Sequence, residues 1–316
     1  MITNYPSITQ YQQLVELKDY RPTTKYEYVR QVRKLAEHFK CDPASLSENR
    51  LREYFVFLRQ EKQWQGSAMT QARVALRSFF RENLKAGQDW TVFEDLCIAR
   101  PETLPLVLTR EEVALVLRTL HERRFQVCLR LIYHCGLRVG EAVTLDPHDI
   151  HGRENPPRLH IKNAKGGKDR YVPIAAAMVE ELRQWWRTHR NPRWLFPAQQ
   201  LGLPAGQTAH AMKTSSVQAA FAAARLECGL HPDAHVHTLR HSYATHMLEA
   251  GVNIRQLRDY LGHTSLETTL IYTHLTALSE ARTQATMQTL YQSLQGKDRA
   301  SASSPDRKST RLNSSH

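Results

Sequence analysis

Six residues of the chain have side chains that could act together on a phosphodiester. In chain order they are Arg138, Lys165, His237, Arg240, His263 and Tyr272. The two arginines offer planar arrays of N–H donors that suit the non-bridging oxygens of one phosphate. Placed around a pentacoordinate phosphorus, they would stabilise the charge that grows in the transition state. A divalent metal performs this task in many nucleases, so the set predicts chemistry that needs neither a metal nor another cofactor.

Tyr272 is the candidate nucleophile, because a phenolic oxygen can attack phosphorus once its proton is removed. An ordinary tyrosine has a pKa of about 10, so it needs a positive field and a nearby base at neutral pH. Histidine suits that proton transfer because it titrates near neutrality. Lys165 stands in the Gly-rich segment NAKGGKDR, where a lysine on a turn can deliver a proton to the leaving oxygen.

Helical spacing groups several of these side chains. His237 and Arg240 are three residues apart and are expected on one helix face, and His241, four residues after His237, can share it. Arg138 and Glu141 are also three residues apart. Glu141 is therefore expected to support the first arginine by orienting its guanidinium group.

Five short motifs follow one another along the chain. They are GLRVGE at 136–141, the lysine turn at 163–170, HTLRH at 237–241, LGH at 261–263, and Tyr272 nine residues after His263. No single motif identifies a protein, but the ordered set resembles the tyrosine recombinases of the phage integrase family. The resemblance covers residues 109–294, whereas residues 1–100 match the helical core-binding domain of that family only in character.

The resemblance implies a role for each residue of the set. Arg138 and Arg240 would clamp the phosphate, Glu141 would support Arg138, and His263 would hydrogen-bond the scissile phosphate. The remaining roles are Lys165 as general acid for the 5′-oxygen, with Lys168 as a rival, His237 as base or proton shuttle, and Tyr272 as nucleophile. His241 is expected to support the site.

The implied reaction is a transesterification on double-stranded DNA. Tyr272 would form a 3′-phosphotyrosyl link and release a 5′-hydroxyl, and a 5′-hydroxyl from a partner strand would reverse the attack. The covalent link retains the bond energy, so no ATP is needed. The family acts as a tetramer in which each subunit donates a C-terminal helix to a neighbour, and the amphipathic segment 276–294 fits that helix.

The elements that must position these residues are mainly helical, with a small antiparallel β-sheet. Residues 1–100 show helical stripes and predict a DNA-binding core-binding domain, 101–108 contain two prolines and predict a linker, and 109–296 form the expected catalytic domain. That domain opens with a capping box from Thr109 to Glu112. Segments 158–162 and 171–174 have β-type composition, and Pro173 places its strand at an edge.

Further helices are expected in the second domain before the amphipathic segment 276–294, and the one at 265–275 would carry Tyr272. Their ranges are 175–187, 214–227, 237–249, 253–261 and 265–275. Residues 297–316 have almost no apolar side chains and are expected to be disordered. Residues 307–316 resemble translated cloning sequence and are interpreted as non-native.

Composition favours a polyanionic partner. The chain has 316 residues, with 43 Lys and Arg against 31 Asp and Glu, which gives a formal net charge of +12. Nucleic acid is therefore the first expected partner and an anionic membrane surface the second. No apolar run is long enough to span a bilayer. Five cysteines without a CxxC pair argue against a disulfide framework, so the cytoplasm is the expected location.

Three other interpretations stay open at this point. The chain could be a DNA-binding protein of the same fold without catalysis, or a strand-passing enzyme similar to type IB topoisomerases. A zinc site is a third possibility, because five histidines gather between His231 and His246, although no HExxH motif or cysteine accompanies them. Within the family, the layout favours a compact Xer-like or mobile-element recombinase. Integron integrases carry a helical insertion for which 171–237 is too short.

Overall fold

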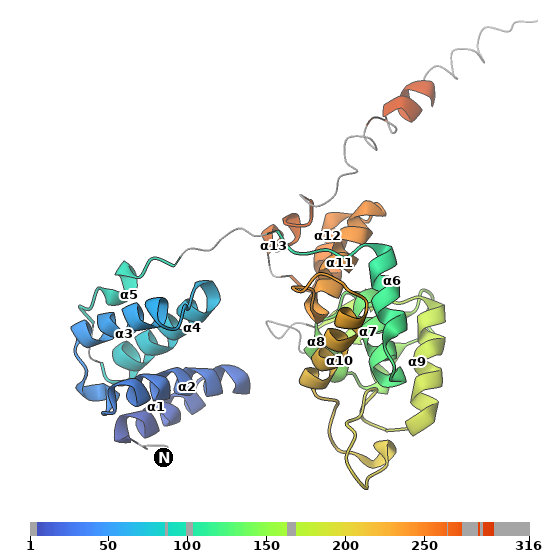
Figure 1. The fold of residues 1–316 in the computed structure, drawn as a ribbon. Coiled ribbons are helices and arrows are strands. Elements are labelled where there is room, and N and C mark those ends of the chain that lie inside the picture. Colours follow the sequence, from blue (N-terminus) through green and yellow to red (C-terminus); the bar gives the residue numbers. More distant parts are fainter. Residues whose placement is uncertain are drawn as a thin grey trace, which may run out of the picture. The chain divides into compact units, whose positions relative to one another are not determined.

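The computed structural model describes residues 5–85, 88–98, 104–162, 169–263, 265–273, 284 and 287–293. The chain divides into two compact units, Met1–Thr103 and Leu104–His316 (Figure 1). Both are dominated by helices, and the second also contains a small antiparallel sheet, which confirms the predicted fold class. Lys165, most of the predicted C-terminal helix 276–294 and the tail 297–316 lie outside the described residues.

The first unit is a bundle of amphipathic helices. Its helices are α1 (Pro6–Leu17), α2 (Pro22–Phe39), α3 (Glu48–Gln60), α4 (Gly66–Arg77) and α5 (Val92–Asp95), with a 3-10 helix η1 (Pro43–Ser45) and a π-helix η2 (Ser78–Asn83). The helical stripes predicted from spacing form its core, in which Val32, Leu35 and Leu51 are fully buried. Tyr11 adds a polar contact, since its hydroxyl donates a hydrogen bond to the Ala75 carbonyl at 3.1 Å.

The helices of the second unit pack around a large hydrophobic core and a smaller cluster that contains Leu257, Leu261 and Tyr272. They are α6 (Arg110–Thr119), α7 (Arg123–Cys135), α8 (Val139–Val143), α9 (Ala176–His189), α10 (Thr214–Glu227), α11 (Val236–Glu249), α12 (Ile254–Leu261) and α13 (Glu267–Leu270). The predicted capping box is present, because the Thr109 side chain accepts from the Glu112 N–H while the Glu112 carboxylate accepts from the Thr109 N–H. Among the described helices, none has the length and apolar character needed to cross a lipid bilayer.

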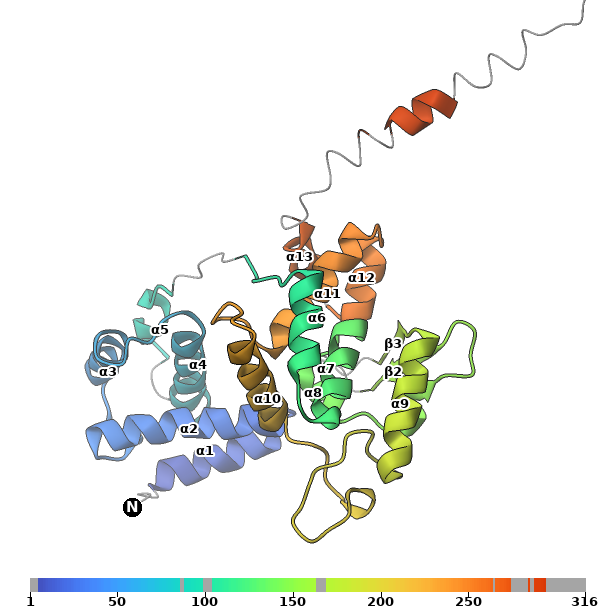
Figure 2. The same cartoon turned by 45° about the vertical axis from the view of Figure 1, so that its right-hand side comes forward.

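A three-stranded antiparallel sheet completes the second unit. Its strands are β1 (Ile150–His151), β2 (Arg158–Ile161) and β3 (Arg170–Pro173). They follow the order β1-β2-β3, and β2 and β3 are labelled in Figure 2. Leu159 pairs with Val172 in the register, and both are buried. Pro173 lies on an edge strand, as predicted. β1 was not predicted, because two residues are too few to show an alternating pattern.

Two helices of this unit end at glycines in the left-handed region. Gly136 (φ +61°) ends α7 and Gly262 (φ +63°) ends α12, so the chain turns sharply before Arg138 and His263. Such φ values favour glycine because it has no Cβ. The predicted helix 265–275 was too long: α13 covers only Glu267–Leu270, and Tyr272 lies in the turn that follows.

Candidate active site

The first predicted arginine stands at the start of α8. Arg138 is the N-cap residue of this helix, and its backbone N–H donates to Oε2 of Glu141 at 2.9 Å. Its Nη1 donates to Oε1 of the same carboxylate at 2.8 Å. The three-residue spacing thus produces the expected contact between the two side chains. Glu141 fixes both the backbone and the guanidinium of Arg138.

Glu141 also binds a second arginine, Arg170, which is not among the residues predicted from the motifs. Arg170 donates from Nη1 to Oε1 at 3.0 Å and from Nη2 to Oε2 at 2.8 Å, which is a two-point ion pair. Nη1 of Arg240 lies 3.9 Å from Oε2. Burial by itself would raise the pKa of Glu141, but hydrogen bonds and positive charge from Arg170 and Arg138 outweigh it and lower the pKa to about 2.

Arg170 links three parts of the second unit. It begins β3, it pairs with Glu141 on α8, and its Nε donates to the Tyr260 carbonyl near the end of α12 at 2.7 Å. Gly262 packs directly on it, because a Cβ at that position would lie 3.0 Å from Cδ and Nη1 of Arg170. The side chain of Arg170 therefore joins the sheet, through β3, to the segment that carries His263.

The second predicted arginine is almost wholly buried. Arg240 is 1% exposed, and its Nη1 donates to the Gly136 carbonyl at 2.7 Å. Its Nη2 donates to the Leu261 carbonyl at 2.5 Å and to Nε2 of His263 at 3.1 Å. Burial and the nearby charge of Arg138 lower its pKa to about 9, so the guanidinium stays positively charged at neutral pH.

Two neighbours hold the neutral ring of His263 in one tautomer. Arginine can only donate, so Nε2 of His263 accepts from Arg240. Nδ1 must then carry the proton of the neutral ring, and it lies 2.9 Å from Oγ1 of the buried Thr269. Burial and the positive charges of Arg240 and Arg138 lower the pKa of His263 to about 3. The ring is neutral at physiological pH.

The candidate nucleophile is buried beside these groups. Tyr272 is 3% exposed, and its hydroxyl lies 2.8 Å from Nδ1 of His241. Its ring is nearly parallel to that of His263, with centroids 6.5 Å apart. Burial raises the pKa of Tyr272, whereas the charges of Arg240 and Arg138 act to lower it.

The first histidine of HTLRH contacts the second. The rings of His237 and His241 meet edge to face with centroids 4.6 Å apart, as their spacing on α11 predicts. Desolvation of the ring and the charge of Arg240 lower the pKa of His237 to about 4. Within the described residues, His241 rather than His237 is the histidine that hydrogen-bonds Tyr272.

The predicted residues therefore gather in one place, with one exception. A continuous chain of contacts links them in the order Arg138, Glu141, Arg240, His263, Tyr272, His241 and His237. Lys165 is the exception, because it lies outside the described residues. Across the part of the chain that is described, no three His, Cys, Asp or Glu side chains are grouped in a way that could hold a metal ion.

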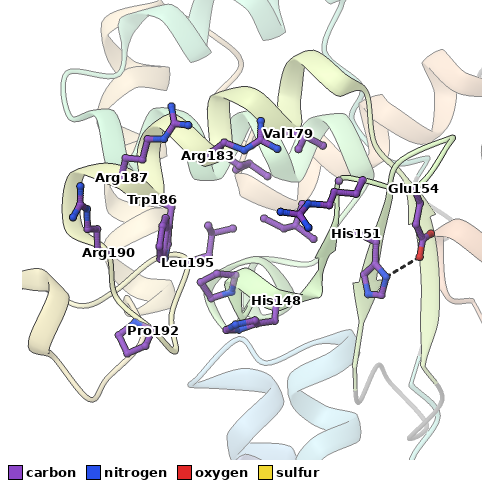
Figure 3. Close-up of a pocket in the computed structure, with 15 residues that line it drawn as sticks. His148, His151, Glu154, Val179, Arg183, Trp186, Arg187, Arg190, Pro192 and Leu195 are labelled. Atoms are coloured by element: carbon purple, nitrogen blue, oxygen red, sulfur yellow. Dashed lines mark hydrogen bonds and ion pairs between the residues drawn. The ribbon is translucent and has the colours of Figure 1, made fainter.

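A separate pocket of about 820 Å³ lies between α9 and residues 147–154 (Figure 3). Arg183, Arg187 and Trp186 of α9 line one side of it. It contains none of the predicted site residues, so the candidate chemistry depends on the contact network around Arg240 rather than on this cavity.

Each of the two units matches a known protein family. Residues 107–278 match the Phage integrase family, and residues 8–90 match the family described as Phage integrase, N-terminal SAM-like domain. The chain is 30% identical over 274 residues to a tyrosine recombinase of Pseudothermotoga lettingae, which covers 79% of this chain and 91% of that protein. It is also 30% identical over 220 residues to tyrosine recombinase XerC of Alcanivorax borkumensis, covering 66% and 69%.

Solved structures show the same fold at lower identity. XerH site-specific recombinase, bound to its palindromic difH substrate in a post-cleavage complex, aligns with a TM-score of 0.66 at 22% identity and covers 89% of this chain and 84% of that one. A lambda integrase dimer bound to a COC′ core site aligns with a TM-score of 0.66 at 17% identity, covering 84% and 75%.

Proposed function

Since the chain belongs to the phage integrase family of tyrosine recombinases, we propose that it recombines DNA at specific sites by cutting and rejoining strands through Tyr272. The observation that carries this proposal is a chain of contacts, in which Glu141 lies against both Arg138 and Arg240, and Arg240 leads on to two histidines and the tyrosine. Arg240 contacts His263, the ring of His263 lies parallel to Tyr272, and Tyr272 contacts His241. A phosphate bound by Arg240 and Arg138 would lie next to the phenol.

The proposed reaction exchanges one phosphoester bond for another. The Tyr272 oxygen forms a bond to phosphorus while the bond from phosphorus to the 5′-oxygen breaks. The 5′-oxygen leaves as a hydroxyl after receiving a proton, for which Lys165 is the proposed donor, and the 3′ end stays on Tyr272. A 5′-hydroxyl from another strand then attacks the phosphotyrosyl link and frees the enzyme. Arg138 and Arg240 stabilise the charge on phosphorus in both steps.

The proposal assigns a task to each unit and an assembly to the whole. The unit Met1–Thr103 would bind DNA as a core-binding domain, and Leu104–His316 would carry the catalytic site. The DNA-bound state of XerH and of lambda integrase supports double-stranded DNA as the substrate. We propose a homotetramer on two duplexes, joined by exchange of the C-terminal segment 276–294. Mass photometry of the protein with its DNA should then show four chains per complex.

The experiment uses nicked duplexes tiled over the DNA that flanks the gene, because a nick beside the cleavage point traps the covalent adduct. Wild-type protein should give a protein–DNA band on a denaturing gel, and Tyr272→Phe should give none while binding DNA normally. Tyr260→Phe is the matched control, since Tyr260 meets Arg170 through its backbone carbonyl rather than its hydroxyl.

The same assay separates the alternatives. DNA binding by the wild type without any adduct would support a non-catalytic protein of this fold. Relaxation of supercoiled plasmids of arbitrary sequence would support a strand-passing enzyme of the topoisomerase type. An adduct that persists in Tyr272→Phe would show that another residue is the nucleophile.

A further inference from the structure

We propose that His241, the residue after the second arginine, is the catalytic group that takes the proton from Tyr272. This inference rests on the proposed function and deepens it, because it assigns the role of general base to His241 instead of the expected His237. It begins from one contact, in which Nδ1 of His241 lies 2.8 Å from the Tyr272 hydroxyl. A general base must lie within hydrogen-bond reach of the proton that it removes, and His241 satisfies this condition.

The surroundings of His241 hold its ring in place. It lies in α11 on the turn that follows His237, whose ring packs edge to face against it. The titratable groups that face it are Tyr272, His237, His235 and Arg240. Arg240, one residue earlier on the helix, is fixed by the carbonyls of Gly136 and Leu261. The base and the phosphate-binding arginine therefore stand on one rigid element.

The direction of the hydrogen bond follows from the protonation states. Desolvation lowers the pKa of His241 to about 4, and electrostatic interactions with His237, His235 and Arg240 act in the same direction, so the ring is neutral at physiological pH. The pKa of Tyr272 is raised by burial, so the phenol keeps its proton. The phenol then donates to Nδ1, and the proton of the imidazole is on Nε2.

Substrate binding would move this proton. A phosphate held by Arg138 and Arg240 adds negative charge, which favours the protonated form of a neighbouring histidine. As the bond between the Tyr272 oxygen and phosphorus forms, the phenolic proton passes to Nδ1 of His241, and the imidazolium faces the negatively charged phosphorane. When a 5′-hydroxyl later displaces Tyr272, the same proton returns to the phenolic oxygen. The nucleophile is thus activated only when DNA is present.

His237 occupies a different place in this sequence of events. Its ring contacts His241 rather than the phenol, and more than a third of the residue is open to solvent. It acts on the reaction through His241, as a positioning residue that keeps the ring aligned with Tyr272.

The test measures single-turnover cleavage of a nicked duplex as a function of pH. His241→Asn keeps an amide oxygen near the position of Nδ1, so it can accept the hydrogen bond but not the proton. We expect its cleavage rate at pH 7 to fall roughly 100- to 1,000-fold and to rise about tenfold per pH unit, as for attack that needs a pre-ionised phenol. His246→Asn on the same helix is the matched control, because His246 contacts Tyr133 instead.

A second arm changes the acidity of the nucleophile. Replacing Tyr272 with 2,3-difluorotyrosine lowers the pKa of the phenol, and this should accelerate His241→Asn far more than the wild type. An unchanged pH profile in His241→Asn, or equal acceleration in both backgrounds, would overturn the assignment of His241 while leaving the recombinase proposal intact. No adduct from the wild type on any DNA would overturn both.

A third measurement does not depend on a variant that folds. Nitrogen-15 NMR of the histidine side chains in the free wild-type protein should show a neutral His241 with its proton on Nε2. A proton on Nδ1 would mean that the imidazole donates to Tyr272, and this result would exclude it as the base.

Discussion

Arg170 and Glu141 form a two-point ion pair whose side chains are only 8% and 11% exposed. Removing one partner of such a pair leaves a buried charge without compensation, which costs about 3–5 kcal/mol. We therefore expect Arg170→Met and Glu141→Gln each to lower the free energy of unfolding by several kcal/mol. The double variant should lose less than the sum of the two single losses, because it removes both charges of this ion pair together. Chemical unfolding of the four proteins completes the cycle.

A more exposed pair in the same unit serves as the control. Arg130 and Glu181 meet through one contact of 2.7 Å with side chains 36% and 26% exposed. Arg130→Met should cost less than about 1 kcal/mol, since solvent screens such pairs. Equal losses at Arg130 and Arg170 would contradict the special weight given to the Arg170 contact.

Acid should weaken the protein through Glu141. Its pKa is lowered from an ordinary value of 4.5 to about 2, so the unfolded chain binds a proton at a higher pH than the folded one. The stabilisation is present above about pH 4.5 and is lost as the pH falls towards 2, and it amounts to about 3 kcal/mol. Urea unfolding across this range should show the decline in the wild type, and Glu141→Gln should show a smaller one.

The histidines of the site predict a separate loss at milder pH. The pKa values of His241 and His263 are lowered from 6.5 to about 4 and about 3. Below pH 6.5 these histidines are protonated in the unfolded chain but not in the folded site. Each one therefore reduces the free energy of unfolding by up to about 1.4 kcal/mol per pH unit. Thermal unfolding at pH 7.5, 5.5 and 4.5 should show this, and His263→Gln should flatten the decline. Parallel curves for the two proteins would argue against it.

Two neighbouring glycines should respond oppositely to the same substitution. A Cβ on Gly136 would lie 2.4 Å from the Tyr243 ring, and the backbone there has φ +61°. Gly136→Ala should therefore cost about 2–4 kcal/mol through backbone strain and overpacking. At Gly140, inside α8, an added Cβ would meet nothing within 4 Å. Gly140→Ala should be neutral or stabilising by up to about 1 kcal/mol, and urea unfolding compares the two.

Cleavage should not require a divalent metal. Arg138 and Arg240 already supply positive charge beside the candidate nucleophile, as their effect on the pKa of Tyr272 indicates. Adduct formation on a nicked duplex is therefore expected at an unchanged rate in EDTA. Loss of the adduct in EDTA, restored by zinc, would instead favour the metal interpretation of the histidine cluster between His231 and His246.

Much of the local structure could be predicted because it depends on short-range spacing. Helix α10 has the predicted bounds Thr214–Glu227, and the capping box at Thr109 follows from residues three positions apart. The contact between Arg138 and Glu141 also lies within one helical turn. Hydrophobic periodicity and hydrogen bonds of this kind are encoded by adjacent residues, so a sequence displays them directly.

The contacts that build the site span larger separations and were not predictable in the same way. Arg170 looked like one more cation after a Gly-rich turn, yet it binds Glu141, 29 residues earlier. The bond between His241 and Tyr272 joins residues 31 positions apart. The first depends on how β3 packs against α8, and the second on how the segment after α13 packs against α11. The sequence feature that could have identified Arg170 was its position at the start of the strand that follows the lysine turn.

Arg240 donates hydrogen bonds to two carbonyl groups at the carboxyl ends of different helices, Gly136 at the end of α7 and Leu261 at the end of α12. Each helix end carries a partial negative charge. The fold itself thus compensates the desolvation of this cation, and nucleic acid is not required to hold it in position. The position and charge of Arg240 are consequently set by the protein alone, so this guanidinium needs little reorganisation when a phosphate approaches.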